Sequence, residues 1–337
     1  MAAPKTAVGL WGQYLAARMA DMSLTIFDVR SNLATAAALG RLMYRLDRRH
    51  RLRTIAHLKL AFPEMSDSAR AALARRSFEH FVQLVVEICH SPRLFNFESW
   101  PRRVTFHNVG RSLDMINAGR SVIMVTGHLG NWEALGGILG MLGYPIDAIA
   151  RPIDNRLIND WLLGIREKRG MRIITKWDAT DRMVEVLSSG GVLGFIADQN
   201  AGDRGLFVPF FGKLASTYKS IGLLAMTQQT PIVCGYARRV GSGYRFEMGV
   251  QDIIEPADWE GRPDPLYYIT ARYMRALEMT IRQTPEQYLW MHRRWKSRPR
   301  FERQGKPMPD SLRRNLEALP WMDEATLASV SQPVNIA

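Results

Sequence analysis

The chain has 337 residues, 47% of them hydrophobic, which is enough to build a sizeable globular core. Its 45 Lys and Arg residues outnumber its 32 Asp and Glu residues, and the net charge of +13 suits a nucleic acid, an anionic membrane or an acidic protein as partner. Its two cysteines lie far apart, without disulfide or zinc-site spacing, and neither a signal peptide nor a membrane-spanning run of ~20 apolar residues is predicted.

Residues 1 to about 60 alternate apolar and basic side chains at helical spacing, with arginines gathered around one apolar face. That face comprises Val29, Leu33, Ala36 or Ala37, Gly40 and Met43. A basic amphipathic helix of this kind suits a membrane interface, and the alternative is a helix packed on its own domain. We favour the membrane because the arginines are dense, and we predict a helical, membrane-associating region over residues 1–100.

A further helix is predicted to begin at Ser66 and Asp67 and to continue to His90. The side chains of His80, Cys89 and His90 lie on it, but the two histidines need not share a face. We therefore expect structural roles for these three residues and no metal site.

Short apolar runs alternate with helical segments through the middle of the chain. The runs are residues 104–107, 122–125, 145–150, 173–174, 192–197, 231–236 and, with alternating polarity, 243–250. Helices are expected at residues 157–168, 178–187, 217–227 and about 269–283. This alternation predicts an α/β fold with a mixed, mostly parallel sheet flanked by helices, which we assign to residues 101–305. Residues 306–337 are expected to form a peripheral C-terminal tail.

Two segments gather aromatic side chains. Residues 202–212, GDRGLFVPFFG, predict an exposed apolar loop beside a strand end, suited to an acyl chain or a membrane, unless its phenylalanines enter the core. Residues 285–299 interleave aromatic and basic side chains, which suits either stacking on single-stranded nucleic acid or a membrane interface.

The stretch 121–137 carries the clearest chemical signal. A buried strand leads into the loop TGHLG, whose two glycines allow a sharp turn beside a ligand. Asn131 is placed to cap the following helix, and Glu133 falls in its first turn. Glu133 can then fold back and hold one ring N–H of His128, so that the other ring nitrogen accepts a proton. The alternative is a structural histidine in a tight turn and a glutamate placed by the helix dipole.

Five segments in a fixed order resemble one protein family. GHLGNWE has the H-x4-D/E pattern of glycerolipid acyltransferases, and AFPEMS, ARPIDN, ADQNAGDRGLFVPFFG and PEQYLWMHRRWKSRP accompany it between about residues 30 and 300. Together they resemble the lipid A biosynthesis acyltransferases, which transfer lauroyl or myristoyl chains. The resemblance implies a glycerolipid acyltransferase-like fold with an N-terminal helical extension. It also implies acyl carrier protein as donor, and that acidic protein suits the positive charge of this chain.

Members of that family usually carry a membrane-spanning N-terminal helix. Here that region is interrupted by Arg18, Asp21, Asp28 and Arg30. We therefore expect peripheral or weak anchoring on an anionic membrane surface, at the cytoplasmic face of the inner membrane.

The expected reaction is direct acyl transfer. His128, poised by Glu133, takes a proton from an acceptor hydroxyl, which attacks the thioester carbonyl of the donor. Backbone N–H groups at Gly130–Asn131 or an arginine are expected to stabilise the oxyanion. No G-x-S-x-G pattern is present, and Cys89 and Cys234 have apolar neighbours, so no acyl-enzyme is predicted.

The remaining site residues are assigned to substrate binding. By resemblance, Arg166 and Asp198 belong to the site; Asn131 is added beside them, and Arg151 is a candidate for a phosphate or carboxylate of the acceptor. We expect a lipid A precursor or related glycolipid as acceptor, no metal or other cofactor, and no nucleic acid partner.

The sequence leaves other functions open. The acceptor can instead be a lysophospholipid, a mannoside or an ornithine lipid, the donor can be coenzyme A, and the acyl chain length is not specified. A zinc hydrolase is disfavoured because the chain has no H-E-x-x-H pattern. A non-enzymatic binder of membranes or nucleic acid explains the charge, but it does not explain a His-Glu pair at a strand end.

Overall fold

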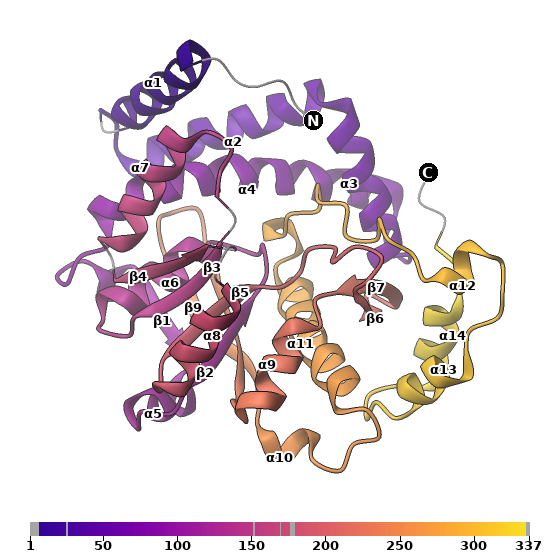
Figure 1. The fold of residues 1–337 in the computed structure, drawn as a ribbon. Helices are drawn as coiled ribbons and strands as arrows, with labels where there is room; N and C mark the ends of the chain where they lie inside the picture. Colours follow the sequence, from indigo (N-terminus) through magenta and orange to yellow (C-terminus); the bar gives the residue numbers. More distant parts are fainter. Residues whose placement is uncertain (1–6, 25, 151, 169, 176–178, 335–337) are drawn as a thin grey trace.

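The computed structural model describes residues 7–24, 26–150, 152–168, 170–175 and 179–334. Long helices from the N-terminal part of the chain cross the top of the view in Figure 1, above a twisted sheet with helices on both faces. The last helices of the chain pack at the right-hand side of the same view.

The N-terminal part forms the helices α1 (Ala7–Ser23), α2 (Val29–Leu46), α3 (Arg48–Ala61) and α4 (Asp67–Leu94). The helical pattern over the first 60 residues is divided because Asp28 and Asp47 accept backbone N–H groups at the starts of α2 and α3. Ser66 caps α4 in the same way, as its position in the sequence predicts.

The apolar face of α2 packs against α4 rather than against a membrane. Leu33 and Ala36 are each 1% exposed. At Gly40 the two helices approach so closely that an added Cβ would lie 2.5 Å from the Cα of Glu79. The membrane interpretation of this face was therefore wrong, because the same amphipathic pattern serves a helix that packs on its own protein.

The helix α1 instead carries an apolar stripe that faces away from the protein. Val8, Trp11, Leu15, Met19 and Met22 follow helical spacing and are between 52% and 82% exposed. Asn155 at the start of α7 holds the opposite side of α1 by donating to the carbonyl of Leu10 at 3.0 Å. Within the described ranges, no helix combines the length and the hydropathy needed to cross a bilayer.

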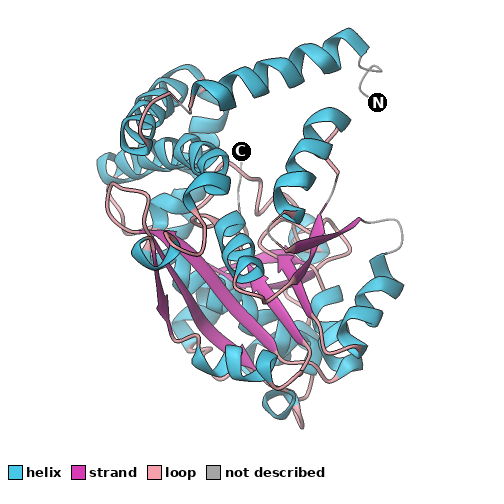
Figure 2. Cartoon of the chain, turned by 90° about the vertical axis from the view of Figure 1, so that its left-hand side faces the viewer, coloured by secondary structure: helices cyan, strands magenta, loops and turns pink. Residues whose placement is uncertain are grey.

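The central sheet has seven strands and confirms the predicted mixed, mostly parallel arrangement (Figure 2). Its strands are β1 (Val104–His107), β2 (Val122–Thr126), β3 (Ile146–Ala150), β4 (Met171–Thr175), β5 (Val192–Ile196), β8 (Ile232–Arg239) and β9 (Phe246–Ile254). They lie in the order β1-β9-β8-β2-β5-β3-β4, and the antiparallel pair is β8 with β9. The connecting helices are α5 (Gly110–Asn117), α6 (Trp132–Met141), α7 (Arg156–Glu167), α8 (Ala179–Ser188) and α9 (Ser220–Gln228), and the short α10 (Pro256–Trp259) follows β9.

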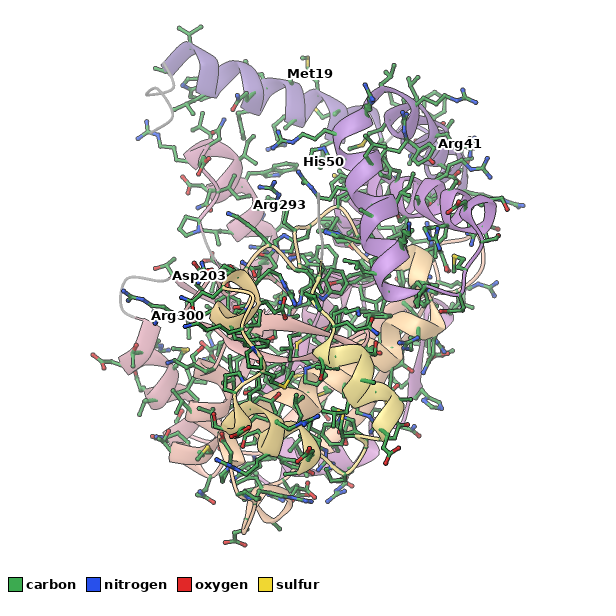
Figure 3. All side chains as sticks on the ribbon, turned by 90° about the vertical axis from the view of Figure 1, so that its right-hand side faces the viewer. Met19, Arg41, His50, Asp203, Arg293 and Arg300 are labelled. Atoms are coloured by element: carbon green, nitrogen blue, oxygen red, sulfur yellow. The ribbon has the colours of Figure 1, made fainter. Side chains whose placement is uncertain are left out.

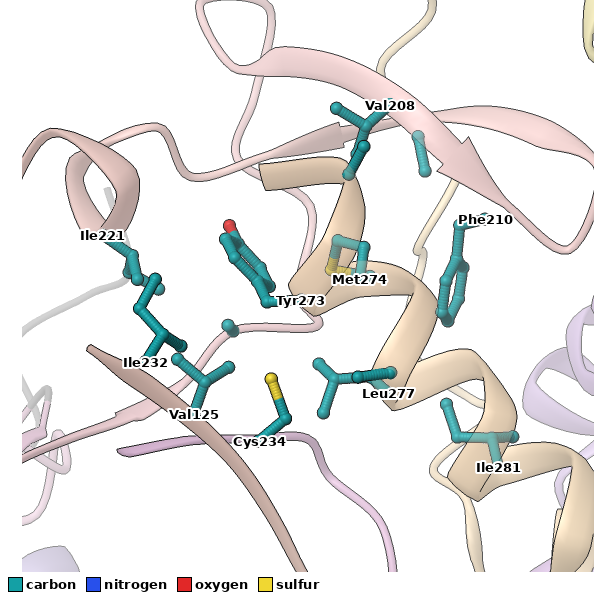
Figure 4. Close-up of a cluster of buried hydrophobic side chains, with 14 of the residues drawn as sticks. Val125, Val208, Phe210, Ile221, Ile232, Cys234, Tyr273, Met274, Leu277 and Ile281 are labelled. Carbon is teal, nitrogen blue, oxygen red and sulfur yellow. The ribbon is translucent and has the colours of Figure 1, made fainter. Parts of the chain in front are cut away.

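The main core lies between the sheet and α11 (Pro265–Gln283). Figure 4 shows Tyr273, Met274 and Leu277 of α11 packed over Val125 of β2 and Cys234 of β8. Burial of this apolar face fixes the position of β2, the strand that leads into the His128 loop.

The two aromatic segments also belong to this core. Residues 206–217 form a hairpin of β6 (Leu206–Phe210) and β7 (Lys213–Thr217), in which Val208 and Phe210 are fully buried. In the second segment, Tyr288 is 3% exposed and Trp290 and Trp295 are 1% exposed. The expected exposed apolar loop and aromatic binding surface were therefore wrong, and the helix expected from residue 217 begins at Ser220, in α9.

The C-terminal segment is more closely packed than a peripheral tail. It forms α12 (Arg300–Arg303), α13 (Asp310–Glu317) and α14 (Glu324–Ser331). Leu316, Leu319 and Val330 are at most 3% exposed and join the main core. The polar composition of residues 306–337 concealed these few apolar anchors.

Candidate active site

Strand pairing brings His128 and Asp198 together. The strands β2 and β5 are adjacent and parallel, with Thr126 of β2 opposite Ile196 of β5. Each of the two side chains follows its strand end by two residues, so both lie at the same edge of the sheet. Nδ1 of His128 is 2.7 Å from Oδ1 of Asp198. The carboxylate that holds the ring is therefore Asp198, and the expectation that Glu133 would do so was wrong.

The charge of Asp198 sets the protonation of this pair. Burial alone would lower the pKa of His128, but the charge of Asp198 and the hydrogen bond to it outweigh burial and raise that pKa above its ordinary value. Burial would raise the pKa of Asp198, but the charge of His128 and the hydrogen bonds from it lower that pKa to about 2. With Nδ1–H donated to Asp198, Nε2 faces the amide nitrogen of Gln199 at 3.3 Å and can accept a proton.

Gly130 gives the His128 loop its shape. Its φ of +58° is a left-handed conformation, and an added Cβ would lie 1.9 Å from the carbonyl oxygen of Ala237. Its N–H donates to the carbonyl of Gln287 at 2.9 Å, and the N–H of Asn131 donates to the carbonyl of Ala237 at 2.7 Å. Because both N–H groups are engaged, the expected oxyanion role of this backbone was wrong.

Asn131 supports the site from behind. Its side chain is fully buried and caps α6 by accepting the N–H of Ala134 at 2.9 Å, as predicted. Its amide group donates to Glu87 on α4 at 3.1 Å, and Glu87 pairs with Arg239 of β8 at 3.1 Å. The predicted contact of Asn131 with substrate was therefore wrong, because both ends of the side chain are occupied inside the protein.

Glu133 and Arg166 form a bidentate ion pair beside the histidine. Nε and Nη2 of Arg166, in the last turn of α7, donate to the two carboxylate oxygens of Glu133 at 3.0 and 2.5 Å. Burial would lower the pKa of Arg166, but its hydrogen bonds to Glu133 raise that pKa. Nη1 of Arg166 makes no hydrogen bond to any described residue, so this N–H group can serve a ligand. Arg151 lies outside the described residues.

An apolar cavity begins at this ion pair. Glu133, Arg166 and Trp132 line it near the carboxyl ends of the strands, and the ring of Trp132 lies 4.9 Å from that of His128. Ile146 and Met171, the first residues of β3 and β4, line it at the opposite ends of those strands. The cavity therefore follows the strands away from His128, and its long apolar shape suits a hydrocarbon chain.

Comparison with known proteins identifies the family. A sequence profile of the bacterial lipid A biosynthesis acyltransferases matches residues 8–297. The chain belongs to this family. It is therefore an acyltransferase.

Three relatives from Escherichia coli (strain K12) are similar to this acyltransferase. The lipid A biosynthesis lauroyltransferase is 28% identical over 268 residues, which are 77% of this chain and 84% of the relative. The lipid A biosynthesis palmitoleoyltransferase is 28% identical over 72% of this chain and 78% of the relative. The lipid A biosynthesis myristoyltransferase is 24% identical over 86% of this chain and 88% of the relative. The three names give three different acyl groups.

Sequence reasoning missed several residues around the histidine of this acyltransferase. Gln199 follows Asp198 directly, and this adjacency was the available signal. Burial and the charge of Asp198 raise the pKa of Tyr288. Arg294 is fully buried and donates to Ser216 and Thr217 of the hairpin. Tyr288 and Arg294 lie in residues 285–299, for which the sequence predicts a binding surface. Their burial inside the protein was therefore not predicted.

The two cysteines and His90 have structural environments. Burial raises the pKa of Cys234 and raises that of Cys89 to about 11, which disfavours the thiolate at both positions. His90 bonds to Asn32 at 2.9 Å. Across the described part of the chain, no three His, Cys, Asp or Glu side chains are grouped to hold a metal ion.

Proposed function

We propose that this acyltransferase moves a fatty acyl chain from an acyl-carrier-protein thioester to a hydroxyl of a lipid A precursor or related glycolipid. The observation that carries the proposal is the His128–Asp198 pair beside an apolar cavity that begins at Glu133 and Arg166. The family membership supports the lipid A-type acceptor.

The proposed chemistry begins with proton transfer to Nε2 of His128 from the acceptor hydroxyl. The oxygen attacks the thioester carbonyl, whose π electrons move to oxygen and give a tetrahedral oxyanion. The oxyanion then collapses, the C–S bond breaks, and the thiolate takes the proton from Nε2. Asp198 stabilises the imidazolium between these steps. No acyl-enzyme is needed, and the buried thiols of Cys89 and Cys234 are poor nucleophiles.

We assign stabilisation of the oxyanion to Arg166. Its Nη1–H group is the donor that the Glu133 pair leaves available, and Glu133 holds the guanidinium in one orientation. The charge of Glu133 also helps to raise the pKa of His128. In this proposal Glu133 acts by positioning Arg166 and by electrostatics, and the contact with the ring belongs to Asp198.

Membrane contact is assigned to the exposed stripe of α1. Its large apolar side chains can enter the head-group boundary, while the arginines of α2 and α3 meet anionic lipid or the acidic carrier protein. We propose that residues 1–100 attach the enzyme peripherally to the cytoplasmic face of the inner membrane, and that residues 101–305 carry the catalytic domain.

The test is an acyl-transfer assay with a matrix of substrates. Purified protein is offered a lipid A precursor, a lysophospholipid and an ornithine lipid, each with acyl carrier protein thioesters of C10 to C18 chains and the matching coenzyme A thioesters. Mass spectrometry is expected to find one added acyl group on the lipid A precursor with carrier-protein donors. Transfer only to another acceptor would keep the proposed reaction and replace the proposed acceptor. No transfer to any acceptor by folded protein would overturn the proposal.

A further inference from the structure

A second cavity borders the His128 loop and differs in character from the apolar one. Among its lining residues are His50 and Arg53 of α3, and Arg293 and Lys296 of the segment after Trp290. Figure 3 shows His50 and Arg293 at the same side of the molecule, below α1. We call this second cavity the basic cleft.

The basic cleft connects to the reacting nitrogen of His128 through two of its lining residues. Asn200 lines the cleft and follows Gln199, whose amide faces Nε2 of His128 at 3.3 Å. Leu289 also lines the cleft, and its N–H donates to the carbonyl of His128 at 3.0 Å. The apolar cavity approaches the same ring from Trp132, so a chain in one cavity and a head group in the other can meet at His128.

The arginines and the lysine of the basic cleft have no carboxylate partner at ion-pair distance among the described residues. In the ranges that the structure describes, Arg53, Arg293 and Lys296 form no ion pair with a carboxylate. Arg53 donates to the carbonyl of Met291 at 3.2 Å, and burial together with the charge of Arg293 lowers its pKa. The nearby carboxylate of Asp47 is already held by His50 at 2.6 Å. Like charges kept together without counter-ions indicate a site for an anionic ligand.

We propose that the basic cleft binds a phosphate group on the sugar head of the acceptor glycolipid, an inference that rests on the proposed function. Arg293 and Lys296 supply donors for phosphate oxygens, and the apolar side chains of Met43 and Phe81 can cover the sugar or the start of its acyl chains. Several cations suit a doubly charged phosphomonoester better than the singly charged phosphodiester of the donor's pantetheine arm. The acceptor hydroxyl must also reach Nε2, which faces this side of the ring.

The experiment compares a phosphorylated lipid A precursor with the same precursor after phosphatase treatment. Arg293→Ala and Lys296→Ala remove exposed side chains, and Arg102→Ala removes an exposed arginine that lines neither cavity. Each cleft variant is expected to raise KM for the phosphorylated acceptor about tenfold, and the double variant about a hundredfold, as loss of charge-assisted hydrogen bonds predicts. With the dephosphorylated acceptor the variants should match the wild type, and the KM of the donor should not change.

Three outcomes would overturn the proposal: an equal effect on both acceptors, an effect on the donor KM alone, or no effect. The second would assign the cleft to the phosphate of the donor. Binding of the two precursors in detergent micelles to His128→Ala protein, with and without Arg293→Ala, tests the cleft without turnover. Phosphate-dependent binding together with no acyl transfer by the wild-type protein would keep the cleft and remove the proposed function. Acyl transfer at the same rate with and without the phosphate would keep the proposed function and overturn the proposed role of the cleft.

Discussion

Replacing Asp198 by Asn tests the origin of the basicity of His128. The side chain of Asp198 is 3% exposed and lies 2.7 Å from Nδ1 of His128. Asparagine is nearly the same size and offers an oxygen to the ring N–H, but it carries no charge. The substitution therefore removes the electrostatic part of the contact and leaves the position of the ring unchanged.

The size of the effect follows from the contact. A hydrogen bond to a charged group contributes ~1.5–3 kcal/mol, and this contact favours the charged ring, so its loss should lower the pKa of His128. Burial then dominates and places that pKa below its ordinary value. The imidazolium that forms during transfer loses the same stabilisation, and kcat should fall by roughly 10–100-fold.

The assay is the pH profile of kcat/KM. A general base must be neutral, so wild-type activity should rise with pH through a pKa above 6.5, the ordinary value for His128. In Asp198→Asn the acid limb should move to lower pH, with a lower plateau. Asp203→Asn, a change at an exposed aspartate five residues further on, should leave the profile unchanged. An acid limb that stays in place or moves to higher pH would refute the assignment of Asp198.

Four further changes have distinct expected results. Gly130→Ala should lower the unfolding free energy by at least ~2 kcal/mol in a denaturant titration, because its φ is left-handed and its Cβ strikes a carbonyl. Arg166→Lys should lower kcat/KM by roughly 10–100-fold at an unchanged Tm, since lysine cannot form the bidentate pair. Gly136→Ala should shift the preferred donor to shorter chains in the mass-spectrometric assay, since its Cβ pushes the end of a methionine side chain into the apolar cavity. Met19→Glu should reduce co-sedimentation with anionic vesicles, because this side chain is 64% exposed on the stripe of α1.

Each of these predictions has a control or a contradicting result. Gly243→Ala adds a methyl group in open space and should not change stability. A wild-type kcat/KM in Arg166→Lys would contradict the proposed role of Arg166 in stabilising the oxyanion. Unchanged chain preference in Gly136→Ala would mean that the acyl chain lies outside the apolar cavity. Unchanged vesicle binding in Met19→Glu would contradict the proposed contact between α1 and the membrane.

The sequence predicted the strands and helices well because their signals are local. The apolar run at β2, its loop and the cap at Asn131 are each readable within a few residues. The partner of His128 was not readable in this way. Glu133 is five residues away in sequence, whereas Asp198 reaches the ring through the pairing of β2 with β5. Proximity along the chain favoured the wrong carboxylate.

Errors about surfaces have a common physical cause. An apolar helix face or an aromatic run is equally suited to a membrane and to the interior of its own protein. Leu33 of α2 and Phe210 of β6 are buried, whereas Trp11 of α1 is 52% exposed. Which face finds a partner depends on packing between distant segments, such as α2 on α4, and a single sequence does not specify that choice.

The most direct test of the account compares acyl transfer by the wild type and by His128→Ala, with lipid A precursor binding measured on the same samples. His107→Ala, at an exposed histidine of the edge strand β1, is the matched control. His128→Ala is expected to bind the precursor with wild-type affinity and to transfer at less than about one hundredth of the wild-type rate, since general-base catalysis contributes roughly 10²–10⁴-fold. Wild-type transfer by a folded His128→Ala protein would contradict the assignment of this histidine as the base.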